Sequence, residues 1–446
     1  MFENLYRKIV SRKLSALQDS RIQIVENGER VEFGQADSRE LVEIHIHDPR
    51  FYQRVVFGGG LGAAESLMDG DWTCDDLTAL VRIFARNIHL GDRLNGGFGL
   101  FKKLAEQLLY RWKRNSIEQA KQNIHEHYDL GNDFFKEFLD PTMNYSAGVF
   151  QSPDDTMLLA SINKMWRVCR KLDLSPSDHL LEIGTGWGSL AVFAATQFGC
   201  RVTTTTISEE QYLYAKSRVR ALGLEDQVTV VKQDYRQLEG KFDKIVSIEM
   251  IEAVGHEYLQ SFFAKCNDLM SANGMMLVQS IVIRDQRHRA HLNNTDFIKK
   301  YIFPGGCLPS NLSLLQNIER VSDLQMLNVE DIGMDYAQTI AHWKDRFLEN
   351  LDKIRDIGFR DDRFIRMWHY YLCYCQAGFL ERQISNVQLL VAMRDSRSIP
   401  TPASWELNPR ELRRLAANWV GNFAEGGEAT LGEVDETASL TLASNR

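Results

Sequence analysis

The feature that most constrains this chain of 446 residues is a series of short apolar runs between residues 160 and 395. Helix-like stretches separate most of them. Such runs are typical of strands buried on both faces of a largely parallel sheet with helices on either side. We therefore predict an α/β fold with a Rossmann-like, seven-stranded sheet whose final strand is antiparallel. The runs are HLLEIG (from 179), RVTTTTI (201), QVTVVKQD (227), FDKIVSIEM (242), MMLVQSIVI (275), LQMLNVEDI (324) and NVQLLVAM (386).

The sequence before this sheet predicts a smaller α+β domain over residues 1–115. It contains a basic helix, strand-like runs at RIQIVENG, LVEIHIHD and YQRVVFGGG, and a helix around LTALVRIFARN. The glycine-rich GGGLGAAESL, from Gly58, lacks the Lys-Ser/Thr ending of a phosphate loop, so we interpret it as a tight turn before a helix. Residues 116–400 form the main domain, and residues 401–446 a last helix with a disordered acidic tail.

Charge and composition limit the partners. The net charge of −8 does not favour nucleic acid. Residues 1–23 and 99–123 are locally basic, which fits either a contact with an anionic bilayer or ordinary solvated helix faces. The absence of an apolar window of transmembrane length and of a secretory signal predicts a cytoplasmic protein. The seven cysteines form no CxxC pair and the pair His125 and His127 is a weak motif, so we expect no metal.

The stretch LEIGTGWGSL indicates a strand, a glycine turn and a helix. Its glycines are Gly184, Gly186 and Gly188. A dinucleotide fold would place a further glycine at 189 and an acid about 20 residues later, and neither is present. An acid before the turn, Glu182, followed by G-x-G-x-G favours S-adenosylmethionine, although a purely structural turn is the alternative. Downstream, Asp234 can accept from an adenine amino group and Tyr235 can lie on its ring.

Several motifs in order resemble the cyclopropane-fatty-acyl-phospholipid synthase family, over roughly residues 120–395. The resemblance implies the seven-stranded methyltransferase sheet. It also implies a reaction in which S-adenosylmethionine modifies cis double bonds of acyl chains, usually in phospholipids. The motifs are HYDLGNDFFKEFLDPTMNYS (127–146), LEIGTGWG (181–188), TTISEEQ (205–211), DYRQL (234–238), IEMIEAVGHEYL (248–259), YIFPGGCLPS (301–310) and YYLxxC (from Tyr370).

The resemblance also implies the cofactor contacts. Tyr145 and Ser146 would close over S-adenosylmethionine. The glycine turn, including Trp187, would line its methionine side. The ribose would be held by Thr206, Ile207 and Gln211.

In the family a bound bicarbonate is thought to remove the proton that permits ring closure. For that anion the resemblance points here to Glu252, Ile281 and Tyr336, which match the family pattern. The usual Cys is Ala147 and the usual His is Gln279. Either Gln279 holds bicarbonate more loosely through its amide, or the cation is resolved as a methylene, a methyl branch or a shifted double bond.

Other interpretations of these residues stay open. Glu252 could cap a helix, Gln279 could be an ordinary core amide, and Cys375, at a position where the family has a cysteine, could be a packed thiol. Aromatic side chains could stabilise the cation that methyl transfer creates. The candidates for that role are Tyr145, Tyr301, Phe303 and Tyr336.

Three functional hypotheses follow. The first is a lipid C-methyltransferase on the inner face of the membrane, acting on phospholipids with unsaturated acyl chains and docked by its basic N-terminal helix. The second is a methyltransferase for a soluble small molecule, with the N-terminal domain forming a homodimer. The third is a lipid-binding protein without catalysis, against which the intact cofactor motifs argue.

Overall fold

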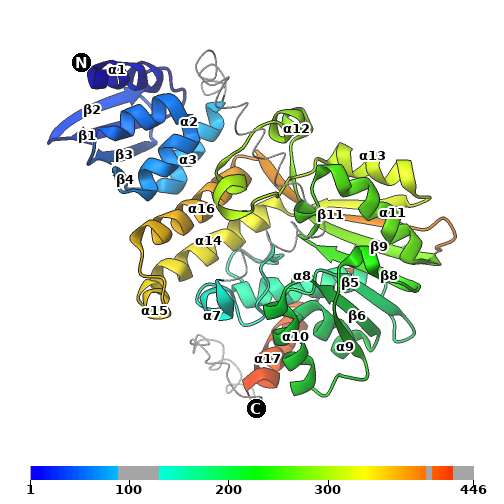
Figure 1. The fold of residues 1–446 in the computed structure, drawn as a ribbon. Coiled ribbons are helices and arrows are strands. Elements are labelled where there is room, and N and C mark those ends of the chain that lie inside the picture. Colours follow the sequence, from blue (N-terminus) through cyan, green and yellow to red (C-terminus); the bar gives the residue numbers. More distant parts are fainter. Residues whose placement is uncertain (1, 89–129, 398–403, 425–446) are drawn as a thin grey trace.

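The computed structural model describes residues 2–88, 130–397 and 404–424, and it contains two sheets (Figure 1). The larger sheet has seven strands in the order β10-β11-β9-β8-β5-β6-β7, which confirms the predicted α/β fold. The pairs among β9, β8, β5, β6 and β7 are parallel, whereas β11 is antiparallel to both neighbours, β9 and β10. The strands are β5 (His179–Ile183), β6 (Arg201–Thr206), β7 (Val228–Lys232), β8 (Phe242–Ile248), β9 (Met270–Ile283), β10 (Gln325–Asp331) and β11 (Ile384–Ala392).

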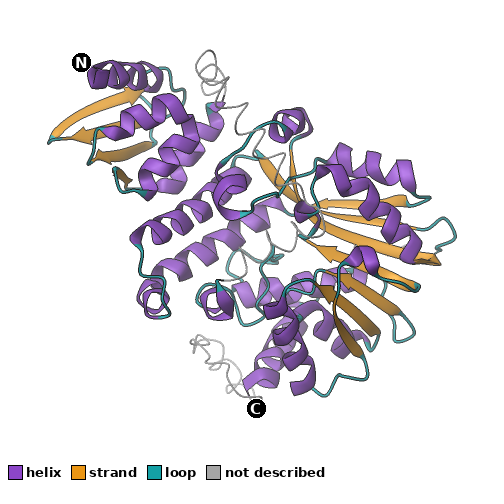
Figure 2. Ribbon diagram, viewed as in Figure 1, coloured by secondary structure: helices purple, strands orange, loops and turns teal. Residues whose placement is uncertain are grey.

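Successive side chains of the large sheet enter different cores because strand residues alternate between faces. Leu180 and Val246 belong to one buried cluster, and Leu181 and Ile245 belong to another. Figure 2 shows helices on both sides of the sheet. One cluster includes residues of α8 (Met157–Lys171), α9 (Ser189–Phe198) and α17 (Pro409–Ala424); the other includes residues of α11 (Leu259–Leu269) and α13 (Asn311–Val321).

The N-terminal unit contains the smaller sheet, with strand order β2-β1-β3-β4. Its helices are α1 (Phe2–Leu14), α2 (Arg50–Met68) and α3 (Leu77–Arg86). β1 pairs antiparallel with β2 and parallel with β3. The strands are β1 (Arg21–Glu26), β2 (Glu29–Gly34), β3 (Leu41–Ile46) and β4 (Trp72–Cys74).

The prediction of a strand at YQRVVFGGG is wrong, because residues 52–60 lie in α2. The turn predicted at the glycines is a kink inside this helix, where Gly59 has a φ of 55°. At the kink the chain approaches itself closely. A Cβ on Gly62 would lie 2.1 Å from the carbonyl oxygen of Arg54, so the side-chain-free glycine is required there.

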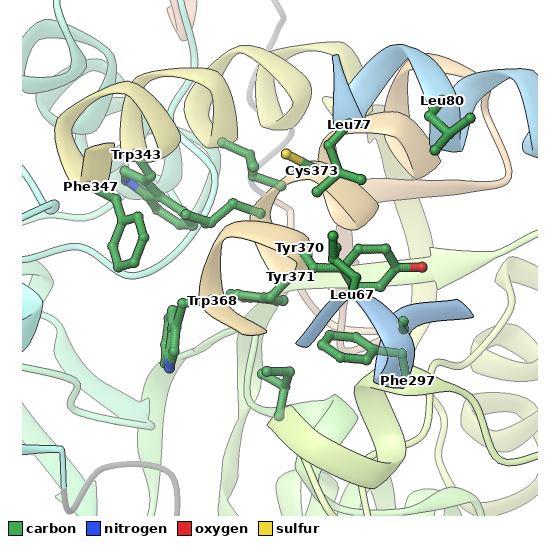
Figure 3. Packing of buried hydrophobic residues seen from close by; sticks show 14 of the residues in the cluster. Leu67, Leu77, Leu80, Phe297, Trp343, Phe347, Trp368, Tyr370, Tyr371 and Cys373 are labelled. Atoms are coloured by element: carbon green, nitrogen blue, oxygen red, sulfur yellow. The ribbon is translucent and has the colours of Figure 1, made fainter. Parts of the chain in front are cut away.

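The N-terminal unit packs against α16 (Asp362–Leu380) of the larger unit (Figure 1). Ion pairs join Arg363 to Asp69 and Arg82 to Glu381 across this boundary. Figure 3 shows the apolar side of the same contact, where Leu67 and Leu77 lie near Tyr370, Phe297 and Cys373. One buried cluster therefore runs from the N-terminal helices into the larger unit.

The remaining helices lie between the large sheet and the N-terminal unit or at the edges of the larger unit. α14 packs against both α16 and β11, so it connects the sheet to the helical side of the protein. They are α7 (Gly131–Lys136), α10 (Glu209–Ala221), α12 (Asp285–Leu292), α14 (Gly333–Glu349) and α15 (Leu351–Asp356).

Candidate active site

The glycine turn connects β5 to α9 at the carboxyl end of the sheet, where parallel sheets bind their ligands. Gly186 has a φ of 52° and Gly188 a φ of 84°, a region that L side chains rarely adopt. A Cβ on Gly188 would lie 2.9 Å from the Cβ of Ala215, so the glycine lets α10 approach the turn. At Gly186 no described atom lies within 4 Å of an added Cβ, and its backbone lines the cavity.

Polar side chains near the ends of β5 and β6 face the turn. Buried Glu182 accepts a hydrogen bond from Thr204 Oγ1 at 2.6 Å, and burial raises the pKa of Glu182 to about 8. Thr206 Oγ1 donates to Gln211 Oε1 at 2.9 Å. The Ser208 hydroxyl caps α10 by accepting from the backbone N–H of Gln211, which fixes that residue beside the turn.

The predicted adenine region follows β7. Tyr235 is buried and contacts Phe262 edge-to-face at 5.3 Å between ring centroids. The carboxylate of Asp234 accepts from the guanidinium of Arg236 at 2.8 and 2.6 Å. Asp234 therefore already binds a cation, which the sequence analysis did not anticipate.

A cavity of about 540 Å³ extends from the glycine turn to a group of buried aromatic and acidic side chains. We call the first part the turn end and the second the carboxylate end. Of the predicted site residues, Gly188 and Gln279 are outside the lining. The lining includes Tyr145, Ser146, Glu182, Gly184, Gly186, Trp187, Thr206, Ile207, Gln211, Asp234, Tyr235, Glu252, Ile281, Tyr336 and Cys375.

Aromatic side chains surround the cavity beyond the turn. Tyr145, Phe303 and Tyr336, three of the four residues suggested for stabilising a cation, line it. Tyr301 does not belong with them, because its hydroxyl donates to Glu65 of the N-terminal unit at 2.9 Å. The sequence could not distinguish Tyr301 from Phe303, since both lie in the same short segment.

Cys375 lies on α16 and lines the cavity beside Tyr371 and Tyr374. Burial raises the pKa of its thiol, so a reactive thiolate is disfavoured. The packed-thiol interpretation fits this environment best.

Glu252 is one of the acidic residues that define the carboxylate end of the cavity. Its Oε1 accepts from the backbone N–H of Ile281 and from Ser280 Oγ at 3.0 Å, both on β9. The carboxyl group therefore contacts strand β9, and its own backbone N–H is a further donor to it. Its buried Oε2 has no hydrogen-bond partner among the described residues. Burial and the neighbouring Glu249 raise the pKa of Glu252 to about 8.

Comparison with known proteins identifies the family. Residues 115–389 match the family model "Mycolic acid cyclopropane synthetase". This chain belongs to that family. It is an S-adenosylmethionine-dependent methyltransferase.

Several relatives of this chain have the names of lipid-modifying enzymes. It is 35% identical to a tuberculostearic acid methyltransferase of Mycobacterium tuberculosis, over 78% of this chain and 82% of that protein. It is 36% identical to the cyclopropane-fatty-acyl-phospholipid synthase of Escherichia coli, over 78% and 87%. A mycolic acid cyclopropane synthase crystallised with SAH and CTAB superposes with a TM-score of 0.56 at 28% identity, over 61% of this chain and 98% of that one.

Two negative observations concern only the described residues. Every helix in residues 2–88, 130–397 and 404–424 is too short or too polar to cross a bilayer. In the same ranges, no three His, Cys, Asp or Glu side chains are grouped to hold a metal ion. His125 and His127 lie outside them.

The carboxylate end contains a second acid, Glu249, which the sequence analysis missed. Glu249 follows β8 and has a φ of 49°. Its Oε1 accepts from Gln279 Nε2 at 2.8 Å, from Asn386 Nδ2 at 2.6 Å and from the Ala147 N–H at 3.0 Å. Its Oε2 accepts from the Tyr336 hydroxyl at 2.7 Å. The simultaneous change of the family's Cys and His to Ala147 and Gln279 was the signal that could have revealed it.

Gln279 is buried in β9, and both the nitrogen and the oxygen of its side-chain amide form hydrogen bonds. Its Nε2 donates to Glu249, and its Oε1 accepts from Gln388 Nε2 at 2.9 Å. Gln388 Oε1 in turn accepts from Lys171 Nζ at 2.7 Å. An amide N–H of Gln279 is therefore directed at a carboxylate of the protein and not at a free anion. It supports Glu249 instead.

Lys164 is a second residue that the sequence analysis missed. Its buried ammonium donates to Ser146 Oγ at 3.0 Å and to Asn144 Oδ1 at 3.3 Å. Burial lowers the pKa of Lys164 to about 8, and the nearby Glu249 opposes that shift. A cation therefore lies between the turn end and the carboxylate end.

Proposed function

We propose that this protein transfers a methyl group from S-adenosylmethionine to the cis double bond of an unsaturated acyl chain in a membrane phospholipid. The cavity that joins the glycine turn to the aromatic, acidic end carries this proposal. It gives a polar cofactor and a long apolar chain one shared, buried volume. Relatives named for fatty-acyl-phospholipids and fatty acids support the substrate class.

The cofactor contacts are proposed residue by residue. The backbone at Gly186 and its neighbours faces the methionine portion, because only a residue without a side chain leaves that space open. Tyr145 and Ser146, which line the same cavity, would close over the cofactor. Lining residues assigned to the methionine side are Glu182, Gly184 and Trp187; to the ribose, Thr206, Ile207 and Gln211; to the adenine, Asp234 and Tyr235.

The reaction needs a dry site in which the alkene lies in line with the sulfonium methyl, because an alkene is a poor nucleophile. Attack forms a carbon–carbon bond, breaks the bond between sulfur and the methyl, and leaves a carbocation. The faces of Tyr145, Phe303 and Tyr336 can stabilise that cation. A proton must then leave, either from the new methyl group or from the acyl chain.

The product depends on which proton leaves. Loss from the transferred methyl gives a cyclopropane, the product we propose first, or a methylene. Loss from the acyl chain gives a methyl branch beside a double bond. The branched product is the second candidate, because Gln279 and Ala147 replace residues that the ring-forming family uses and because one relative is named for tuberculostearic acid.

The N-terminal unit is proposed to dock on the inner, cytoplasmic face of the membrane. Phe2 at the start of α1 is 72% exposed and Phe57 of α2 is 50% exposed. Helix α1 also presents the exposed cations Lys8 and Arg12. Exposed aromatic and basic side chains together favour an anionic bilayer surface.

Product analysis tests this function. Purified protein is incubated with vesicles of unsaturated phosphatidylglycerol and methyl-deuterated S-adenosylmethionine, and the lipids are studied by mass spectrometry and NMR. Two retained deuterons indicate a ring or a methylene, and three indicate a branch. An unchanged lipid despite cofactor binding contradicts the proposal. Co-sedimentation that falls with added salt supports the membrane contact, whereas its absence favours a soluble substrate.

A further inference from the structure

The groups that the family assigns to bicarbonate meet a side chain of this protein instead. Tyr336 and Gln279 both donate to Glu249, as does the backbone N–H of Ala147. Asn386 of β11 adds a fourth donor. A carboxylate and a bicarbonate present the same planar pair of oxygens, so one excludes the other from these donors. Bicarbonate therefore does not fit this site.

The orientation of the donors is fixed from a distance. Lys171 can only donate, so the amide oxygen of Gln388 must face it. The amide nitrogen of Gln388 then faces the oxygen of Gln279, which leaves the nitrogen of Gln279 directed at Glu249. Lys171 also pairs with Glu330, which anchors this chain of amides at the edge of the sheet. The four donors around Glu249, which we call the anion seat, are therefore arranged to bind a negatively charged group.

The two acids of the carboxylate end are unequal. All three donors to Glu249 Oε1 are N–H groups. Burial raises the pKa of Glu249, and these hydrogen bonds and the nearby Lys164 oppose that shift by favouring the charged form. Glu252 Oε1 accepts from one N–H group and one hydroxyl group of β9, and its own backbone N–H also favours the charged form, but its buried Oε2 has no partner among the described residues. Two adjacent carboxylates seldom ionise together. Glu249 is the better anion, and Glu252 the better site for a proton.

We infer that Glu249 is the base of this enzyme and takes the place of a bound bicarbonate. The inference rests on the proposed function. After methyl transfer, a C–H bond of the transferred methyl group gives its electron pair to close the ring, or a C–H bond of the chain carbon next to the cation gives its pair to form a double bond. The proton passes to Glu249 Oε2, for which Tyr336 is the one hydrogen-bond donor among the described residues. No external base is consumed, and S-adenosylhomocysteine leaves.

The backbone supports a functional role for Glu249. Its φ of 49° is a conformation that costs a residue with a side chain about 1 kcal/mol and suits glycine. A glutamate at a position that favours glycine is retained at a stability cost. The same strain makes glycine a suitable replacement for an experiment.

The test uses three full-length variants. E249Q keeps the shape but removes the charge, and E249G leaves the anion seat empty without backbone strain. E349Q, at the exposed end of α14, is the matched control. Lipid methylation is measured in carbon-dioxide-free buffer with and without added bicarbonate or formate. Cofactor binding is measured by calorimetry, and anion binding by the thermal midpoint.

Wild-type protein and E349Q should methylate lipid equally well without bicarbonate. E249Q should lose about 100-fold or more in rate, the usual worth of a positioned base, while it still binds the cofactor. E249G should regain activity and thermal stability with bicarbonate or formate, unlike wild type. Wild-type activity that requires bicarbonate, or an E249Q variant as fast as wild type, would overturn the inference. If wild type modifies no lipid, the proposed function fails, and the thermal midpoints still decide whether the seat accepts an external anion.

Discussion

The turn end and the carboxylate end of the cavity are built in different ways. At the turn end, backbone conformation makes the surface, through glycines with positive φ and the ends of two adjacent strands. At the carboxylate end, side chains from β9, β11 and α14 converge on one acid. A surface made by backbone tolerates side-chain change elsewhere, whereas a converging network depends on every member. The two ends should therefore fail independently.

We expect the largest effect from a substitution that disrupts the carboxylate end without touching Glu249 itself. K171M removes a fully buried ammonium that pairs with Glu330 and orients Gln388. We expect the free energy of unfolding in urea to fall by about 3 kcal/mol, as for other broken buried pairs. Lipid methylation should fall with it, while cofactor affinity in the folded protein stays within about twofold. R167M removes the other cation on Glu330 and should have a smaller effect. Equal losses in both variants would contradict the orienting role.

G188A tests the other end of the cavity, because this substitution disrupts the glycine turn. The new Cβ would meet the Cβ of Ala215 at 2.9 Å, and the φ of 84° is strained for alanine. We expect a loss of about 2 kcal/mol in stability and about tenfold in cofactor affinity, measured by urea unfolding and calorimetry. G223A is the control, because its φ is also positive at 61° but no atom of the described residues lies within 4 Å of the added Cβ. Similar cofactor affinities in the two variants would show that packing at the turn is unimportant.

The pH dependence of stability sharpens the assignment of the two acids. Glu252 has a folded-state pKa of about 8 against a usual 4.5, so the folded protein holds a proton that the unfolded chain releases. Its contribution to stability is complete below pH 4.5 and is lost as the pH rises to 8. E252Q resembles the protonated acid and cannot titrate. Between pH 5 and 8 the wild type should lose roughly 1 kcal/mol per pH unit relative to E252Q. Parallel stability curves for the two proteins would contradict a protonated Glu252.

The smallest effect is expected for T206V at the turn end. The substitution removes the hydroxyl that donates to Gln211 Oε1 at 2.9 Å. One neutral hydrogen bond contributes about 1 kcal/mol, so the dissociation constant of the cofactor should rise about fivefold. The product distribution should not change. T229V, on β7 outside the cavity lining, is the control, and a shift in product with T206V would show that the two ends are coupled.

Sequence reasoning predicted the strands and the glycine turn of the large sheet well, because their signals are local. The seven apolar runs and the glycine spacing each depend on a few consecutive residues, and all seven strands form as expected. Errors arose where tertiary contacts decide. The sequence pattern of residues 52–60 predicts a strand. In the structure these residues belong to α2, because burial of one side of that helix stabilises it. Glu249 escaped notice because its partners, from Ala147 to Asn386, are far away in the chain.

The predicted roles of single side chains depend on the same distinction. Tyr301 and Phe303 are two residues apart, yet one faces the N-terminal unit and the other the cavity. Asp234 was correctly placed at the end of β7, but its pairing with Arg236 could not be foreseen from an adjacent acid and base. Position along the chain predicts which element a residue belongs to; the partner of a side chain requires the packed structure.

The shared apolar core between α16 and the N-terminal helices also has a practical meaning for protein engineering. Leu67, Leu77 and Leu80 shield one side of α16, while Tyr371 and Tyr374 of that helix face the cavity. A catalytic fragment trimmed to begin after residue 130 would present a greasy, water-exposed helix and should precipitate. Any chimera of this enzyme must therefore keep both units together or recode the outer side of α16 with polar residues.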